Sequence, residues 1–151
     1  MNIKDFLSPS YAMVDVRAPD KAYLLQELAR RAGAALDLAA DRIFTELMRR
    51  EELGSTGTGG GVAIPHARMP EVKKPFGMFV RLVHAIKFDS IDGQLVDVVF
   101  LLLLPATPAG EQLNALACVA RKLRDSDMVR RLRRAADGAE LHSVMVTEVP
   151  K

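Results

Sequence analysis

The residues from Val96 to Leu104 form the most apolar part of the chain, because every position after Asp97 carries a hydrophobic side chain. A strand that is apolar on both faces belongs in the middle of a sheet whose two faces are both covered. The uninterrupted run, Val98–Leu104, is seven residues long and far too short for a membrane-spanning helix. We therefore expect a central strand with helices on both sides of its sheet.

Helical and strand-like patterns on either side of this run predict an α/β fold. Asp20 is expected to cap a helix over 21–32 that ends at Gly33, and Asp37 to cap a second helix that runs to about Glu52. Further strands are expected around 14–16 and over 76–83, with an Asp92-Gly93 turn before the apolar run. Later helices are expected over 111–124, from a cap at 126 or 127 to about 136, and over about 138–144. We expect a single domain over 1–151, with loosely ordered ends at 1–12 and 145–151.

The composition is that of an ordinary globular protein, with 49% hydrophobic and 26% charged residues and a formal net charge of +2. The small net charge does not indicate a nucleic-acid binder. The arginines of 121–134 lack interleaved aromatic residues, so we interpret them as a solvated helix face or a docking face for an acidic partner. One cysteine, Cys118, excludes an internal disulfide, and the polar first ten residues are not expected to act as a signal peptide. We expect a cytoplasmic protein without membrane insertion.

The stretch from Gly54 to His66 reads G-S-T-G-T-G-G-G-V-A-I-P-H and is the most unusual part of the sequence. Its first eight residues include five glycines, which gives more backbone freedom than a helix or strand interior tolerates. Val62–Ile64 is long enough for a short strand, and Pro65 lacks the N–H group that would extend it. We therefore expect a glycine loop, a strand that stops at Pro65, and His66 at the strand end before a polar loop.

His66 is the candidate reactive residue. A lone histidine is more often structural, but the glycine loop and the nearby arginines favour phosphate chemistry here. An imidazole with a pKa near 6.5 is partly neutral at pH 7, and neutral imidazole is a competent nucleophile. The candidate phosphate ligands lie in and beside the loop: Ser55, Thr56, Gly57, and Arg50 or Arg49.

Other kinds of site fit the sequence poorly. The loop has no lysine at the P-loop position, and it follows a helix and opens a strand, unlike a dinucleotide-binding fingerprint. His66, His84, His142 and Cys118 show no metal-ligand spacing. We interpret His84 and His142 as surface or packing residues and Cys118 as an inert core residue. No metal site is predicted.

The run Arg50-Glu51-Glu52-Leu53-Gly54-Ser55-Thr56-Gly57, continuing to Gly61-Val62-Ala63-Ile64-Pro65-His66, resembles the fructose/mannitol-type enzyme IIA domain of the bacterial phosphotransferase system. The chain is most similar to the free-standing nitrogen-regulatory branch of that family, and supporting similarity covers most of its length. The resemblance implies a three-layer α/β/α sandwich around a mixed, mostly five-stranded sheet. It implies a phosphohistidine carrier rather than a stand-alone catalyst, without metal or organic cofactor.

The resemblance also assigns roles. His66 would accept a phosphoryl group from a histidine-containing phosphocarrier protein, Arg50 would bind the phosphate, and the targets would be regulatory, such as potassium-transport or sensor proteins. The family commonly has a second histidine where this chain has Gln112, which can donate a hydrogen bond but carries no charge. Gln112 thus favours one alternative, a phosphorylation-independent interaction module. A second alternative also stays open: a sugar-specific enzyme IIA that passes phosphate to a transporter-linked domain.

Overall fold

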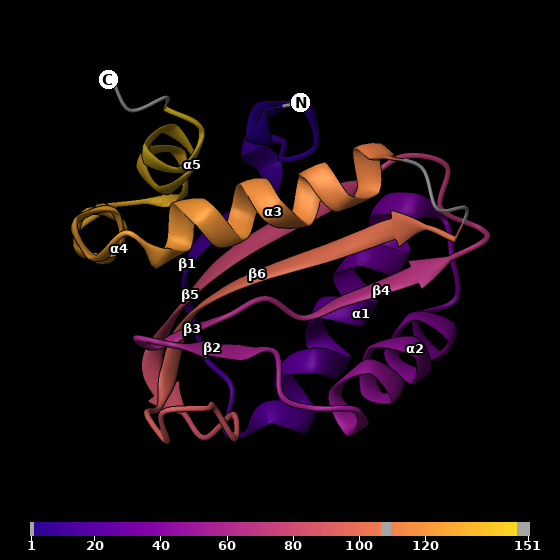
Figure 1. Cartoon of the computed structure of the whole chain (residues 1–151), viewed down its shortest axis with the longest axis horizontal. Helices are drawn as coiled ribbons and strands as arrows, with labels where there is room; N and C mark the ends of the chain where they lie inside the picture. Colours follow the sequence, from indigo (N-terminus) through magenta and orange to yellow (C-terminus); the bar gives the residue numbers. More distant parts are fainter. Residues whose placement is uncertain (1, 107–109, 148–151) are drawn as a thin grey trace.

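The computed structural model describes residues 2–106 and 110–147, with the side chains of 110–113 outside this description. Within these ranges one mixed sheet has six strands in the order β1-β5-β6-β3-β2, and β4 also pairs with β6 (Figure 1). The strands are β1 (Ala12–Val16), β2 (Gly57–Gly59), β3 (Val62–Ala63), β4 (His66–Met69), β5 (Phe76–Ile86) and β6 (Val96–Pro105). The Asp92-Gly93 turn predicted before β6 is present, with Gly93 at a φ of 74° and its N–H donated to the Ser90 carbonyl.

β6 is the central strand, as its apolar run predicts. It pairs antiparallel with β5 on one side and parallel with β3 and β4 on the other. Its side chains alternate between two cores: Val99, Leu101 and Leu103 face one, and Val98, Phe100, Leu102 and Leu104 face the other. A strand buried on both faces needs a helical layer on each.

The helices supply those two layers (Figure 1). α1 (Lys21–Leu36) and α2 (Ala40–Glu52) cover the first core. α3 (Gly110–Arg124), α4 (Ser126–Arg133), α5 (Gly138–Val146) and the 3-10 turn η1 (Ile3–Asp5) cover the second, with a further 3-10 turn, η2 (Pro9–Tyr11), leading into β1. The three-layer α/β/α sandwich is therefore confirmed.

The strand expected to stop at Pro65 continues beyond it to Met69, so the predicted polar loop begins only after Met69 and not directly after His66. Ala63 pairs with Val99 and His66 with Leu102, which is one unbroken register across the proline. Pro65 lacks only a donor, and its carbonyl still accepts the Leu102 N–H at 2.9 Å. β3 and β4 thus lie end to end along β6, which makes the six-stranded sheet five strands wide.

Several helix ends differ from the prediction. Asp20 caps α1 as expected, accepting the Tyr23 N–H at 2.8 Å, but α1 continues past Gly33. A Cβ at Gly33 would lie 2.6 Å from the Leu38 carbonyl oxygen, so glycine permits a close approach there and does not end the helix. Asp37 adopts a left-handed conformation that closes α1, and it does not cap α2. Likewise α4 is capped by Asp125 and ends at 133.

The N-terminal segment is packed, in contrast to the loose end that the sequence favours. Ile3, Phe6 and Leu7 are buried in the second core, and the Phe6 carbonyl accepts the Gly77 N–H at 2.7 Å. Near the other end Met145 is also buried, whereas residues 148–151 lie outside the described ranges.

Candidate active site

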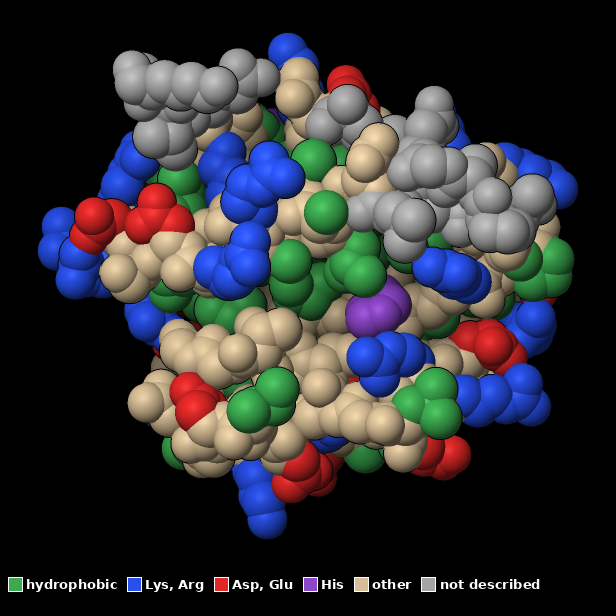
Figure 2. Space-filling view, viewed as in Figure 1, with side chains coloured by type: hydrophobic (Ala, Val, Ile, Leu, Met, Phe, Trp, Pro, Cys, Tyr) green, Lys and Arg blue, Asp and Glu red, His purple; other side chains and the backbone are tan. Residues whose placement is uncertain are grey.

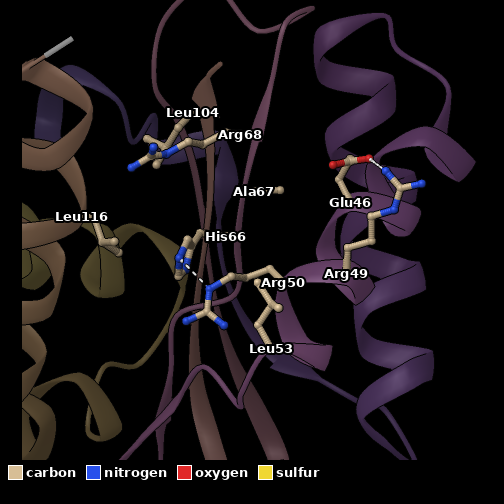
Figure 3. A pocket seen from close by; sticks show the side chains of 9 residues that line it. All are labelled: Glu46, Arg49, Arg50, Leu53, His66, Ala67, Arg68, Leu104 and Leu116. Atoms are coloured by element: carbon tan, nitrogen blue, oxygen red, sulfur yellow. Dashed lines mark hydrogen bonds and ion pairs between the residues drawn. The ribbon is translucent and has the colours of Figure 1, made fainter. Parts of the chain in front are cut away.

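A pocket of about 380 Å³ lies where α2 ends and β4 begins (Figure 3). Its lining combines a histidine, three arginines and one glutamate with apolar residues: His66, Arg49, Arg50, Arg68, Glu46, Leu53, Ala67, Leu104 and Leu116. On the molecular surface a histidine lies at the centre of this face, with basic side chains on two sides and hydrophobic side chains on a third (Figure 2). β4 thus presents His66 from its first position and Arg68 from its third, and α2 brings Arg50 to the imidazole.

The hydrogen bonds of His66 define its tautomer. The ring Nδ1 lies 2.8 Å from the Ile64 carbonyl oxygen. A carbonyl oxygen only accepts, so Nδ1 carries the proton and donates it. Arg50 donates its Nε–H to the other ring nitrogen, Nε2, at 3.3 Å. Both contacts therefore assign the proton to Nδ1 and a lone pair to Nε2.

The surroundings of His66 also keep the ring neutral. Burial lowers the pKa of His66 below its ordinary value of 6.5, and the positive charges of Arg50 and Arg68 lower this pKa further. The Ile64 carbonyl and the Glu51 carboxylate act in the opposite direction and do not cancel the effect. A neutral imidazole with a lone pair on Nε2 is the nucleophilic form.

Arg50 is the arginine that meets His66. Its Nη1 donates to the Gly54 carbonyl at 2.8 Å, so the guanidinium group is held between the start of the glycine loop and the imidazole. Arg49 instead pairs with Glu46 at 2.8 Å and points away from His66 (Figure 3). The choice that the sequence left open between these two arginines therefore falls on Arg50.

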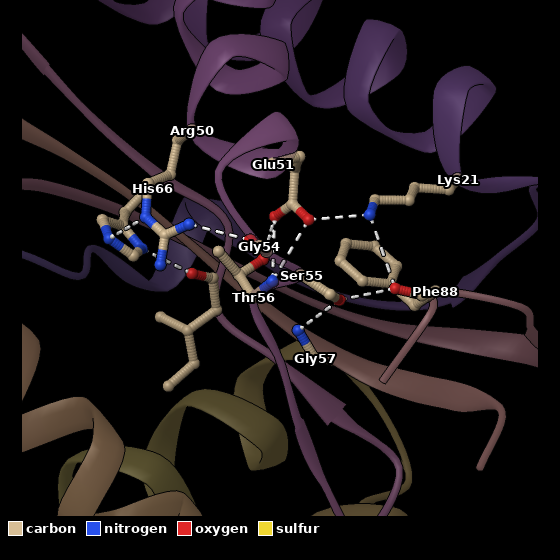
Figure 4. A network of polar contacts seen from close by, with 10 residues as sticks. Lys21, Arg50, Glu51, Gly54, Ser55, Thr56, Gly57, His66 and Phe88 are labelled. Carbon is tan, nitrogen blue, oxygen red and sulfur yellow. Dashed lines mark hydrogen bonds and ion pairs between the residues drawn. The ribbon is translucent and has the colours of Figure 1, made fainter. Parts of the chain in front are cut away.

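Ser55, Thr56 and Gly57 do not line this pocket. The Ser55 hydroxyl donates to the Phe88 carbonyl at 2.6 Å and accepts the Gly57 N–H at 3.0 Å (Figure 4). The Thr56 N–H and hydroxyl both donate to the Glu51 carboxylate. Their phosphate-binding role stays a prediction, and these contacts indicate that the three residues hold the loop in shape.

The other sequence candidates lie elsewhere. Gln112 is in α3, but its side chain falls outside the described part of the structure. His84 is exposed on β5, and His142 packs with its Nε2 2.9 Å from the Leu7 carbonyl oxygen. Cys118 is half-buried against the second core. Over the described ranges, no three His, Cys, Asp or Glu side chains gather as a metal site would require.

Sequence reasoning did not single out two contributors to the site. Arg68 lies two positions after His66 on one strand, and side chains at that spacing share a face, so a strand assignment for 66–69 would have found it. Glu51 has a buried carboxylate that binds the loop, which only the tertiary structure reveals.

Comparison with known proteins identifies the family to which this chain belongs. Residues 5–147 match the family model described as "Phosphoenolpyruvate-dependent sugar phosphotransferase system, EIIA 2". The match covers nearly the whole chain, and the chain therefore belongs to this family, as its motif indicates. No helix in the described ranges is long and apolar enough to cross a membrane.

Within the family, the chain is similar to proteins named as nitrogen regulators. It is 42% identical over 145 residues to a nitrogen regulatory protein of Bradyrhizobium diazoefficiens, covering 96% of this chain and 95% of the relative. The crystal structure of nitrogen regulatory protein IIA-Ntr from Neisseria meningitidis superposes with a TM-score of 0.90 at 33% identity, over 95% of this chain and 98% of that one. IIA mannitol from Escherichia coli has the same fold, with a TM-score of 0.75 at 16% identity over 92% of this chain and 98% of that one.

Proposed function

We propose that this protein accepts a phosphoryl group on His66 from a histidine-containing phosphocarrier protein, and that its phosphorylation state controls its binding to regulatory targets. One observation carries the proposal. Nδ1 of His66 is protonated and bound to the Ile64 carbonyl, which leaves the Nε2 lone pair beside the Arg50 guanidinium in an open pocket. Family membership and the nitrogen-regulatory relatives support it.

The chemistry needs few groups. The Nε2 lone pair attacks the phosphorus of the donor, the donor's P–N bond breaks, and its electron pair returns to the donor imidazole. The Nδ1 proton stays on His66, so no general base is required. Arg50 moves its N–H groups from Nε2 to the phosphoryl oxygens, where charge-assisted hydrogen bonds stabilise the transferred group. The proposed transfer step uses no metal or organic cofactor.

The regulatory part of the proposal is electrostatic. A phosphohistidine adds roughly two negative charges to a pocket that is otherwise basic. A partner surface that fits the unphosphorylated pocket would then be repelled, or a basic one attracted. Potassium-transport or sensor proteins are the kind of target expected for the nitrogen-regulatory branch, and a cytoplasmic location agrees with that role.

The proposal is tested by phosphoryl transfer from the organism's own phosphocarrier protein, followed by intact mass spectrometry at mildly alkaline pH. Wild type is expected to gain one phosphate and His66→Ala none. His84→Ala is the matched control, because His84 is exposed on β5 and is expected to leave transfer unchanged. Uptake by His66→Ala would contradict the acceptor assignment. Failure of wild type would favour an interaction module, with Gln112 as the residue to investigate next.

A second candidate is a sugar-specific enzyme IIA. A protein of Haloferax volcanii named "PTS system fructose-specific EIIA component" is 32% identical to this chain over 83% of it. Adding the sugar-linked acceptor domains encoded by the organism to the phosphorylated protein separates the two roles. We expect the regulator to keep its phosphate, and rapid loss to one acceptor would establish the sugar-specific role.

A further inference from the structure

Glu51 is the one charged side chain that is buried among those the structure describes, and it directly follows Arg50 in α2. Only 3% of the side chain is exposed, and its Oε2 lies 2.7 Å from Nζ of Lys21 at the start of α1 (Figure 4). Burying a carboxylate is costly unless it is paired and hydrogen-bonded. The cost of this burial calls for a reason beyond ordinary packing.

Helix stability does not supply that reason. Lys21 is the first residue of α1, where the helix dipole disfavours a positive charge. Glu51 lies in the last turn of α2, where the dipole disfavours a negative one. Each charge is at the unfavourable end of its helix. The pair is therefore better explained by the loop residues that it contacts.

Glu51 fixes the first turn of the glycine loop. Its main-chain carbonyl accepts the Gly54 N–H at 3.1 Å, and its carboxylate accepts the Thr56 N–H at 3.1 Å and the Thr56 hydroxyl. The Gly54 carbonyl in turn accepts from Arg50, and Arg50 donates to Nε2 of His66. One nitrogen of the imidazole thus depends on the loop conformation that Glu51 sets.

The other ring nitrogen depends on it as well. The Thr56 carbonyl accepts the Ile64 N–H at 3.0 Å, and the Ile64 carbonyl accepts the Nδ1–H of His66 at 2.8 Å. Two chains of hydrogen bonds therefore lead from Glu51 to His66, one from its main-chain carbonyl to Nε2 and one from its carboxylate to Nδ1. Together they place a donor at Nε2 and an acceptor at Nδ1.

Lys21 ties the same loop to a third segment. Its ammonium group donates to the Phe88 carbonyl at 3.4 Å and lies 4.5 Å from the centre of the Phe88 ring. That carbonyl also accepts the Ser55 hydroxyl. The ion pair thus joins α1, α2, the glycine loop and the segment after β5.

We propose that Glu51, paired with Lys21, is a positioning residue that fixes the tautomer of His66 and so selects Nε2 as the phosphoryl acceptor. The selection of the acceptor rests on the proposed function. The tautomer, in contrast, is a property of the unphosphorylated protein and is measurable without any donor.

The test compares wild type, Glu51→Gln and Asp97→Asn by ¹⁵N NMR of the histidine rings at a pH where His66 is neutral. Wild type is expected to show an unprotonated Nε2 and a protonated Nδ1. Glu51→Gln removes the charge and one acceptor, so the two ¹⁵N shifts of His66 are expected to move toward each other as both tautomers become populated. Asp97→Asn breaks an ion pair at the far end of the same loop and is expected to leave the shifts unchanged.

Transfer supplies the second measurement. Glu51→Gln is expected to slow phosphorylation by on the order of tenfold to a hundredfold, because the acceptor nitrogen is misplaced or protonated. If Glu51→Gln does not fold, the double variant Lys21→Met/Glu51→Gln replaces it, because it leaves no unpaired buried charge, and the same tautomer change is expected. Thermal unfolding verifies that each variant is folded.

The outcomes separate the two proposals. Folded variants with wild-type ¹⁵N shifts would overturn the positioning role, as would a wild-type His66 protonated on Nε2. If wild type takes no phosphate but its tautomer still depends on Glu51, the proposed function fails and the positioning of the ring stands.

Discussion

The two ends of the glycine loop are fastened by opposite means. At its start, where Arg50 links Gly54 to His66, the loop is held by the buried Glu51, whose side chain is 3% exposed. At the far end Arg133 donates to the Gly60 carbonyl at 2.9 Å and pairs with Asp97 at 2.8 Å, and these side chains are 37% and 26% exposed. Asp92, also exposed, accepts the Gly60 N–H at 2.9 Å.

The two ion pairs are expected to differ in how much they stabilise the loop. Partly exposed ion pairs are screened by water and salt, so the ion pair at the Gly60 end is expected to contribute little to stability. Removing one partner of a buried ion pair strongly destabilises a protein. The Lys21–Glu51 pair is therefore expected to hold the Gly54 end of the loop in a single conformation. The strongest of these contacts are thus concentrated near the imidazole of His66, and the contacts at Gly60 are expected to contribute less to stability.

The largest effect is expected for Arg50→Ala. The guanidinium group is the charged donor in contact with the acceptor nitrogen, and removing such a donor typically costs about 10²–10³ in rate. Quenched time courses of phosphoryl transfer from the phosphocarrier protein measure this rate. Arg49→Ala is the matched control and is expected to have a much smaller effect, because Arg49 pairs with Glu46. Equal losses in both variants would mean that general positive charge matters and the Arg50 contact does not.

Glu51→Ala is expected to have the next largest effect, on stability. It leaves Lys21 without its partner and removes the acceptor of the Thr56 N–H, for a loss of about 3–5 kcal/mol in the free energy of unfolding. Urea denaturation followed by circular dichroism measures this loss. A loss below about 1 kcal/mol would show that the pair behaves like a surface contact and would remove the contrast between the two loop ends.

The pH dependence of His66 gives a third test. The folded state lowers the pKa of His66, so the unfolded chain binds the proton more readily. The stabilisation from a neutral His66 is therefore complete above the unfolded value of about 6.5 and is lost as the pH falls through the lower, folded value. NMR titration of the ring is expected to give a midpoint below 6.5, with phosphoryl uptake declining only under more acidic conditions. A midpoint above 6.5 would contradict the neutral nucleophile.

The smallest effect is expected for Asp97→Asn at the far end of the loop. Its partly exposed ion pair with Arg133 is expected to contribute no more than about 1 kcal/mol, and less at high salt. Urea denaturation at low and high salt measures both values. A large, salt-independent loss of stability would show that the Gly60 end is held as firmly as the Gly54 end.

Much of the fold follows from local sequence patterns. The apolar run in β6 predicts a central strand, and its alternating side chains do divide between two cores. Asp20 predicts the start of α1 correctly. Gly33 and Pro65 both suggest the end of an element, and neither ends one. Gly33 permits a close approach to the Leu38 carbonyl within α1, and the Pro65 carbonyl still accepts a sheet hydrogen bond from Leu102.

The site was less accessible to sequence reasoning. A histidine after a glycine loop and an arginine before it are visible in the sequence, and the structure brings His66 and Arg50 together. The phosphate-binding role predicted for Ser55 and Thr56 stays a prediction, and the partners of their hydroxyls in this structure, Phe88 and Glu51, could not be read from the sequence. The pairing of Lys21 with Glu51 joins two helices and carries no local signal.

The most direct test of this account is the identity of the phosphorylated nitrogen. The protein is phosphorylated by its phosphocarrier protein after ¹⁵N labelling of histidine, and ³¹P–¹⁵N coupling then identifies the atom bonded to phosphorus. We expect the phosphoryl group on Nε2 of His66, with Nδ1 still protonated and bound to the Ile64 carbonyl. A phosphoryl group on Nδ1, or on another residue, would contradict the account.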